Sequence, residues 1–387
     1  MKIAGIIAEY NPFHLGHAYH IQATRAHCDA VVVCMTGSYT QRGEAACLSK
    51  WERARMALTC GADAVFELPT LFAVRTADAF AHGGVEILAR LGVDLLSFGS
   101  ETDDPELLGR LAALRDREPE AMIERIQQNL NAGMSHARAW GAAAAEMLNV
   151  DAQILNAPNV ILGTEYLRAL KDYSAKPLII RRRGGYRDER PESGTFASAT
   201  AVRGALRAGR MEDVRAWTPE AVHPILEKAP EMHEPDDLLL ARLRGMTEEE
   251  AAELPDVGEG LEKRVLREAL QASGREDLIA RVKCRRYTYA RLSRLTAHAL
   301  LGMDRSLLSR CPAPEYARLI GMREDARPLL SELKRRTAIP IVSDPAKLTE
   351  SECFRLECRA TDLRALQCSR PEDRRAGQER TQKFVCV

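Results

Sequence analysis

Two histidines near the start of the chain have the side-chain type and the spacing to bind phosphate. His14 and His17 lie three residues apart, just after an apolar run, and Gly16 lies between them. At the start of a helix, residues three apart share a face with unpaired backbone N–H groups and the positive end of the helix dipole. Such a face can bind a triphosphate and stabilise charge that develops on its oxygens. Two surface histidines are the alternative, and a zinc site is less favoured because no third ligand lies at useful spacing.

A polar turn lies later in the chain, at residues 198–203. Ser198 and Thr200 offer hydroxyl groups at a predicted helix start, and Arg203 follows with a fork-shaped donor. Because Ser and Thr often serve only as helix caps, this turn carries little weight by itself.

A basic segment at residues 281–310 is the third candidate. It holds eight Arg or Lys residues and a single acid, Asp304, whereas the whole chain has a formal net charge of zero. Tyr287 and Tyr289 interleave with the basic residues, which suits phosphate contacts and base stacking on RNA. The alternative is an exposed basic helix that pairs with the acidic stretch at residues 247–262. From the residues alone the two interpretations are equal.

The elements that would position these residues follow from the apolar pattern. Short apolar runs predict buried strands at residues 3–8, 30–35, 64–68, 95–98 and 177–181. Helix-like stretches lie between them at residues 17–27, 49–60 and 75–91. This alternation predicts an α/β fold with a doubly wound parallel sheet. Since ligands bind beyond the carboxyl ends of such strands, one crevice is expected to be lined by residues 9–17, 36–42, 67–70 and 99–101.

A change of character near residue 205 predicts two domains. A chain of 387 residues is too long for one ordinary core. Beyond residue 205 strand-like runs become scarce, although residues 339–342 could form a late strand, and helical patterns dominate. We therefore expect a catalytic domain at 1–205 and a mostly helical domain at 206–387.

Composition and cysteine spacing indicate the compartment in which the protein acts. The ten cysteines include no Cys-x-x-Cys pair, which favours reduced thiols over disulfides or zinc ligands. No apolar run approaches the ~20 residues that a membrane helix needs. Glu9 interrupts the N-terminal apolar run, so a signal peptide is not expected. These features predict a cytoplasmic protein with no membrane contact.

Several motifs, taken in order, resemble the bacterial tRNA(Met) cytidine acetate ligase family. This family belongs to the nucleotidyltransferase superfamily that shares an HxGH motif. The matching segments are residues 9–14 (Glu-Tyr-Asn-Pro-Phe-His), 35–44, 50–54, 61–69, 98–101, 158–166 and 181–186. Two segments depart from the family pattern: Ala45 follows Glu44 where a proline is expected, and residues 133–136 replace Ser-Tyr-Pro.

The resemblance implies a Rossmann-like nucleotidyltransferase fold and an ATP-dependent ligase. Acetate would attack the α-phosphate of ATP to give acetyl-adenylate, and N4 of the wobble cytidine of elongator tRNA(Met) would then take the acetyl group. Mg²⁺ is expected with ATP, and no protein partner is implied. A small-molecule nucleotidylyltransferase and a non-catalytic RNA-binding protein with a degenerate fold are the alternatives.

The resemblance also implies roles for individual residues. His14 and His17 are expected to be catalytic, contacting the ATP phosphates. The other expected nucleotide-binding residues are Ile7, Ala8, Glu9, Tyr10, Asn11, Pro12, Phe13, Leu15, Gly16, Ala18, Tyr19, His20, Gly99, Asn159, Arg182, Ser198, Thr200 and Arg203. The expected tRNA contacts are Lys283, Arg285, Arg286, Tyr287, Arg291 and Arg294. Lys50 and Arg42 could bind pyrophosphate or RNA phosphate, or be merely solvated.

Overall fold

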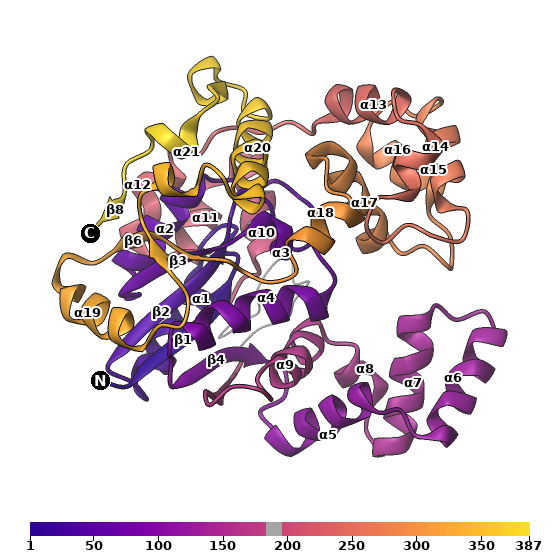
Figure 1. The fold of residues 1–387 in the computed structure, drawn as a ribbon, viewed down its shortest axis with the longest axis horizontal. Coiled ribbons are helices and arrows are strands. Elements are labelled where there is room, and N and C mark those ends of the chain that lie inside the picture. The colour runs from indigo at the N-terminus through magenta and orange to yellow at the C-terminus, as the bar shows by residue number, and fades with distance from the viewer. Residues whose placement is uncertain (183–195) are drawn as a thin grey trace.

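An eight-stranded mixed sheet forms the centre of the molecule (Figure 1). The computed structural model describes residues 1–182 and 196–387. The strands are β1 (Ile3–Ala8), β2 (Ala30–Thr36), β3 (Ala64–Leu68), β4 (Leu95–Ser100), β5 (Lys176–Arg181), β6 (Ala317–Met322), β7 (Ile341–Val342) and β8 (Val385–Cys386). Their order is β5-β4-β1-β2-β3-β6-β7, with β8 also paired to β6.

The first five strands confirm the predicted doubly wound sheet. They run parallel in the order β3-β2-β1-β4-β5, which places the topological switch between β1 and β4. The three predicted helices between them are found within a few residues of their expected ends, as α1 (Leu15–Arg25), α2 (Lys50–Thr59) and α4 (Ala77–Arg90). Strand β2 is buried along its whole length, as a central parallel strand should be.

The second half of the chain returns to this sheet, which the sequence did not predict. Strand β6 pairs antiparallel with β3, and β7 and β8 pair parallel with β6. Residue 205 therefore does not divide the sheet between two domains. Strand β6 was missed because Arg318 interrupts its apolar pattern, yet that side chain is only 5% exposed and pairs with Glu67 on β3. The late strand expected at residues 339–342 is the short β7.

The helices form two groups and a set that packs on the sheet. One group comprises α5 (Pro105–Asp116), α6 (Glu120–Asn131), α7 (His136–Leu148), α8 (Ala152–Leu155) and α9 (Pro158–Ala169). The other comprises α13 (Asp236–Arg244), α14 (Glu248–Ala252), α15 (Leu261–Ala269), α16 (Arg275–Val282) and α17 (Tyr289–Leu301). This second group has an apolar core of its own and stands apart from the sheet in Figure 1. It lies within residues 206–387, which were predicted to be mostly helical and which also contain β6, β7 and β8.

The remaining helices complete the fold around the sheet. They are α3 (Thr70–Ala73), α10 (Ala199–Arg207), α11 (Met211–Trp217), α12 (His223–Leu226), α18 (Arg305–Arg310), α19 (Arg327–Arg336), α20 (Glu352–Leu366) and α21 (Gln378–Thr381). Within the described ranges, no helix is long and apolar enough to cross a membrane. All ten cysteines are free thiols.

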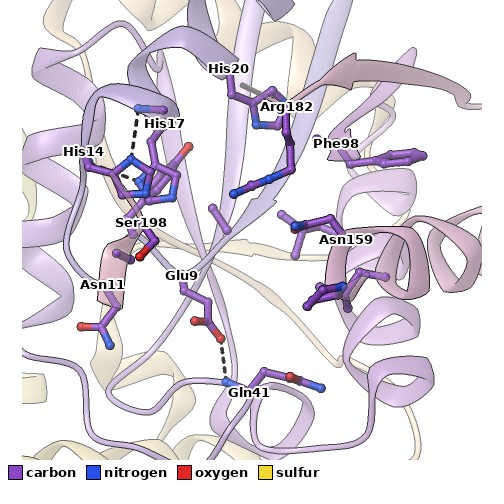
Figure 2. A pocket seen from close by; sticks show the side chains of 18 of the residues that line it. Glu9, Asn11, His14, His17, His20, Gln41, Phe98, Asn159, Arg182 and Ser198 are labelled. Atoms are coloured by element: carbon purple, nitrogen blue, oxygen red, sulfur yellow. Dashed lines mark hydrogen bonds between the residues drawn. The ribbon is translucent and has the colours of Figure 1, made fainter. Parts of the chain in front are cut away.

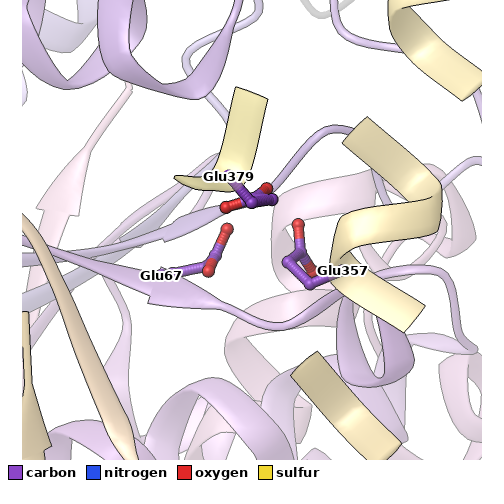
Figure 3. Close-up of side chains that lie close together, drawn as sticks. All are labelled: Glu67, Glu357 and Glu379. Carbon is purple, nitrogen blue, oxygen red and sulfur yellow. The ribbon is translucent and has the colours of Figure 1, made fainter. Parts of the chain in front are cut away.

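A buried charge cluster fixes the C-terminal helices to the sheet. Glu67 from β3, Glu357 from α20 and Glu379 from α21 converge, as Figure 3 shows, and Lys50 and Arg318 lie among them. Lys50 Nζ lies 3.0 Å from Glu357 Oε1, and Arg318 Nη1 lies 2.8 Å from Glu67 Oε2. Lys50 is completely buried, so the expectation that it binds phosphate or is solvated was wrong.

Three buried carboxylates facing two cations leave one negative charge in excess. Burial, and after it the neighbouring Glu357 carboxylate, raise the pKa of Glu67 to about 7. Carboxylate oxygens of all three residues lie within 4.8 Å of one another, a spacing that could suit a metal ion. The ammonium of Lys50 and the guanidinium of Arg318 already supply the positive charge there.

Removing the central cation should destabilise the fold strongly. In Lys50→Met the three carboxylates lose their shared partner, so the free energy of unfolding should fall by about 3–5 kcal/mol. Lys176→Met, at an exposed position of β5, should change it by less than about 0.5 kcal/mol. Urea unfolding of both variants measures the difference, and equal small effects would contradict the role of the cluster.

Candidate active site

A buried arginine holds the loop that leaves β1. Arg53 on α2 is fully buried and donates hydrogen bonds to the carbonyl oxygens of Glu9 (2.6 Å), Thr36 (3.1 Å) and Leu48 (3.2 Å), and also to that of Gly37. The carboxyl ends of β1 and β2 are thereby joined through one side chain. Sequence reasoning placed Arg53 in a family motif without giving it a role.

The two motif histidines form the first turn of α1. His14 is the N-cap, and its Nδ1 accepts a hydrogen bond from Gly16 N–H at 3.0 Å. The Nδ1 of His17 accepts one from His14 N–H at 3.3 Å. The rings stack with centroids 3.7 Å apart (Figure 2). Because a backbone N–H can only donate, each neutral ring must carry its proton on Nε2.

Burial keeps these rings neutral. Burial, and after it Arg182 and Arg203, lower the pKa of His14 to about 3. Burial and the adjacent His14 ring lower the pKa of His17 well below its ordinary value. Burial and Arg182 lower the pKa of His20 to about 4. At neutral pH all three are imidazoles, so His14 and His17 each offer one Nε2–H donor.

The histidines line a cavity of about 380 Å³ at the switch point of the sheet (Figure 2). This volume lies within the range of small-molecule sites. The predicted residues that line it are Ile7, Ala8, Glu9, Tyr10, Asn11, His14, Gly16, His17, Tyr19, His20, Gly99, Asn159, Arg182, Ser198, Thr200 and Arg203. Arg42, Gln41 and Glu44 also line it. Of the predicted residues, Pro12, Phe13, Leu15 and Ala18 are not among the lining residues.

Phe13 supports the site from behind. It is completely buried and packs against Tyr10, with ring centroids 4.9 Å apart, and against His17 at 5.5 Å. The motif thus mixes residues that face the cavity with one that anchors the loop in the core. A sequence motif does not distinguish these two roles.

Glu101 joins two predicted residues on the opposite wall. Its Oε1 accepts a hydrogen bond from Asn159 Nδ2 at 2.6 Å and lies 3.9 Å from Arg182 Nε. The backbone N–H of Arg182 donates to Ser100 O at 3.0 Å. Glu101 therefore positions an amide and a guanidinium beside Gly99. The sequence placed Glu101 at the crevice but did not assign it this function.

The later polar turn also reaches the cavity. Ser198 is the N-cap of α10, and its Oγ accepts a hydrogen bond from Ala201 N–H at 3.1 Å, which leaves its hydroxyl proton available. Arg203 Nη1 donates to Asn11 O at 2.7 Å, and its Nη2 lies 3.8 Å from Glu44 Oε2. Arg203 thus ties α10 to the histidine loop besides facing the cavity.

The basic segment divides into exposed and structural residues. Lys283, Arg285 and Arg286 are exposed. Arg291 Nε donates to Asp256 O at 2.8 Å, and Arg294 Nε lies 3.0 Å from Asp256 Oδ2. Pairing with the acidic stretch, the alternative weighed from the sequence, therefore describes these two arginines. It also applies to Arg286, whose Nε lies 3.8 Å from Glu259 Oε2. Tyr287 is 5% exposed and packs in the core of α13–α17, so its ring is not free to stack on a base.

A comparison with protein families identifies the class of protein. A family model described as HIGH Nucleotidyl Transferase matches residues 1–379, so the chain belongs to that family. Its sheet order and its histidine pair at the switch point agree with this class.

Curated relatives define the particular family. A tRNA(Met) cytidine acetate ligase from Caldanaerobacter subterraneus is 35% identical over 95% of both chains, and one from Acetivibrio thermocellus is 36% identical over the full length of both. Two crystal structures of Thermotoga maritima TmcAL, one apo and one bound with alpha-thio ATP, superpose with TM-scores of 0.91 and 0.90. They are 30% and 29% identical and cover both chains completely. The chain belongs to the tRNA(Met) cytidine acetate ligase family.

The neutral histidines predict a specific dependence of stability on pH. Since the pKa of His14 in the folded state (about 3) lies below the ordinary 6.5, the unfolded chain binds protons first as pH falls. Its contribution to stability is intact above pH 6.5 and is lost as pH falls toward 3. The side chain in His14→Asn can still cap α1, but as pH decreases the free energy of unfolding of this variant should fall less steeply than that of wild type. The difference between the two slopes should be up to ~1.4 kcal/mol per pH unit. Urea unfolding between pH 7 and 5 tests this, and identical slopes would contradict it.

Proposed function

We propose that this chain joins acetate to ATP as acetyl-adenylate and transfers the acetyl group to N4 of the wobble cytidine of elongator tRNA(Met). Membership of the tRNA(Met) cytidine acetate ligase family over nearly the whole chain is the observation that carries this proposal. The relative bound with alpha-thio ATP supports ATP as the nucleotide. Free thiols are typical of a reducing compartment, so we place the reaction in the cytoplasm.

In this proposal the cavity stabilises charge on the phosphates. The Nε2–H groups of His14 and His17 donate to oxygens of the triphosphate as acetate attacks the α-phosphorus and pyrophosphate leaves. The hydroxyl of Ser198 and the guanidinium of Arg203 add donors from the second turn. Neutral donors fixed before the reaction need no reorganisation as charge develops. No covalent enzyme intermediate is required, since orientation of two bound substrates can supply ~7–11 kcal/mol.

Mg²⁺ is expected to accompany ATP, but we assign it no protein ligands. Among the described residues, the one acidic group with metal-ligand spacing is the buried Glu67, Glu357 and Glu379 cluster. Lys50 and Arg318 neutralise that cluster, and none of its members lines the cavity. A divalent ion that enters with the nucleotide would be held by the phosphates themselves.

We further propose that tRNA lies along the exposed basic residues between α16 and α17. Lys283, Arg285 and Arg286 are exposed there. Arg285 lies close to the turn between α6 and α7, which contains Gly133. A Cβ atom built on Gly133 would be 3.2 Å from Arg285 Nη1. The basic segment therefore lies next to the helical group α5–α9. The α13–α17 group, with its separate core, then serves as the RNA-binding unit.

Incubation with ATP, labelled acetate and bulk tRNA tests the function. Acid-stable label on RNA that digests to N4-acetylcytidine is the expected result. A small-molecule nucleotidylyltransferase would leave all label in the small-molecule fraction, and a non-catalytic RNA-binding protein would consume no ATP. Either result would overturn the proposal.

Loss of the phosphate donors should abolish the first step selectively. In His14→Ala and in His17→Ala, acetate-dependent exchange of pyrophosphate into ATP should fall by at least ~100-fold, because a preorganised donor is removed. Binding of tRNA, measured by filter retention, should stay within twofold. Normal exchange in both variants would refute the role of the histidines.

Charge reversal in the basic segment should have the opposite effect. The double variant Arg285→Glu/Arg286→Glu should bind tRNA at least tenfold more weakly, with a shallower dependence on salt, since phosphate contacts are lost. Its pyrophosphate exchange should be normal. The matched control, Lys334→Glu/Arg335→Glu on exposed α19, carries the same charge change away from this surface. Equal loss of tRNA binding in both pairs would indicate a net-charge effect only.

A further inference from the structure

We propose that Glu9 is the general base of the acetyl-transfer step, accepting the proton that N4 of cytidine loses as it is acetylated. The inference rests on the proposed function and adds a catalytic residue to it. Glu9 lies in the loop between β1 and α1, and its side chain lines the same cavity as the histidines (Figure 2).

The second step needs a proton acceptor. When N4 attacks the carbonyl carbon of acetyl-adenylate, a C–N bond forms and the bond from that carbon to the phosphate oxygen breaks. AMP leaves with the electron pair as an anion. The attacking nitrogen begins with two protons and ends with one, so one proton must pass to a base. A carboxylate takes this proton and later releases it to water, which balances the step.

The motif histidines are unsuited to this task. The Nδ1 lone pairs of His14 and His17 accept backbone N–H groups at 3.0 and 3.3 Å, and each Nε2 already carries a proton. To take up another proton, either ring would have to break its bond to the first turn of α1. Both are therefore donors for the leaving phosphate and cannot serve as acceptors.

Two other titratable groups of the cavity, His20 and Glu44, are also engaged. His20 Nε2 is hydrogen-bonded with Ser97 Oγ at 3.0 Å, and the ring lies beside the positive charge of Arg182. Glu44 pairs with Arg203 at 3.8 Å. Among the described lining residues, Glu9 is the carboxylate without an ion pair.

The surroundings of Glu9 suit a base. Its Oε1 accepts one hydrogen bond, from the backbone N–H of Gln41 at 2.8 Å, which fixes the carboxylate in the cavity. Burial raises its pKa above the ordinary value, while the Gln41 N–H, Arg203 and Arg42 act against this rise and Glu44 adds to it.

Two further groups on packed elements interact electrostatically with Glu9. They are the Tyr166 hydroxyl on α9 and Arg53 on α2. The two cavity arginines, Arg42 and Arg203, also offset the repulsion that the carboxylate would exert on acetate in the first step.

The test separates the two steps in Glu9→Gln. The glutamine oxygen can still accept the Gln41 N–H but cannot take up a proton. Acetate-dependent pyrophosphate exchange reports the first step separately, and it should fall by much less than the rate of acetyl transfer. Single-turnover transfer of acetyl from enzyme-bound acetyl-adenylate to tRNA should fall by ~10²–10⁴-fold and lose its rise with pH. Glu9→Asp, which keeps a carboxylate, should retain part of the transfer rate, and Glu350→Gln, at an exposed position, should match wild type.

Each of the other results of this experiment would overturn the inference. If exchange and transfer fall together in Glu9→Gln, the residue binds the nucleotide or maintains the fold, and the inference is overturned. Unchanged transfer, or slower transfer that keeps the wild-type pH profile, overturns it as well. Wild-type enzyme that performs exchange but never acetylates tRNA would instead refute the proposed function, and the inference with it.

Discussion

The site depends on two hydrogen bonds within one helical turn. Gly16 N–H and His14 N–H donate to the Nδ1 atoms of His14 and His17, and these bonds set the chemistry of both rings. They fix the Nε2–H tautomer, satisfy two backbone donors at the start of α1, and hold the rings in a stack. Burial then keeps the imidazoles neutral. The pair consequently donates hydrogen bonds to the oxygens on which negative charge develops. The proton released in the transfer step must therefore be accepted by another group.

That turn is held in place by charges buried deep in the sheet. Arg53 joins the loop after β1 to the end of β2, and Lys50, one turn earlier on α2, enters the carboxylate cluster that fixes α20 and α21. One helix thus connects the histidine loop with the C-terminal segment. Buried ion pairs are weak evidence of net stability, but breaking one is costly. Their role here is to specify where α2 sits, and with it the end of β1.

The sequence correctly predicted the elements that depend on a local apolar pattern. It did not predict the elements and side-chain roles that depend on residues distant in the chain. Strands 3–8 and 64–68 were located exactly, since a buried parallel strand is apolar along its length. Strand β6 was missed because Arg318 is neutralised by Glu67, 251 positions away, and Lys50 was misassigned because its partner Glu357 lies 307 positions away. In the site, the motif located the cavity, yet Glu101 acquires its role through contacts with Asn159 and Arg182 that only folding creates.

Nuclear magnetic resonance of ¹⁵N-labelled histidine side chains can observe the protonation state of both motif rings. We expect His14 and His17, assigned through His→Asn variants, to show the neutral Nε2–H pattern, with Nδ1 shifted as a hydrogen-bond acceptor. Neither ring should titrate between pH 8 and 5. An imidazolium signal at pH 7, a titration near the ordinary value of 6.5, or a proton on Nδ1 would contradict the assignment of the pair as neutral donors, and with it the role of Glu9.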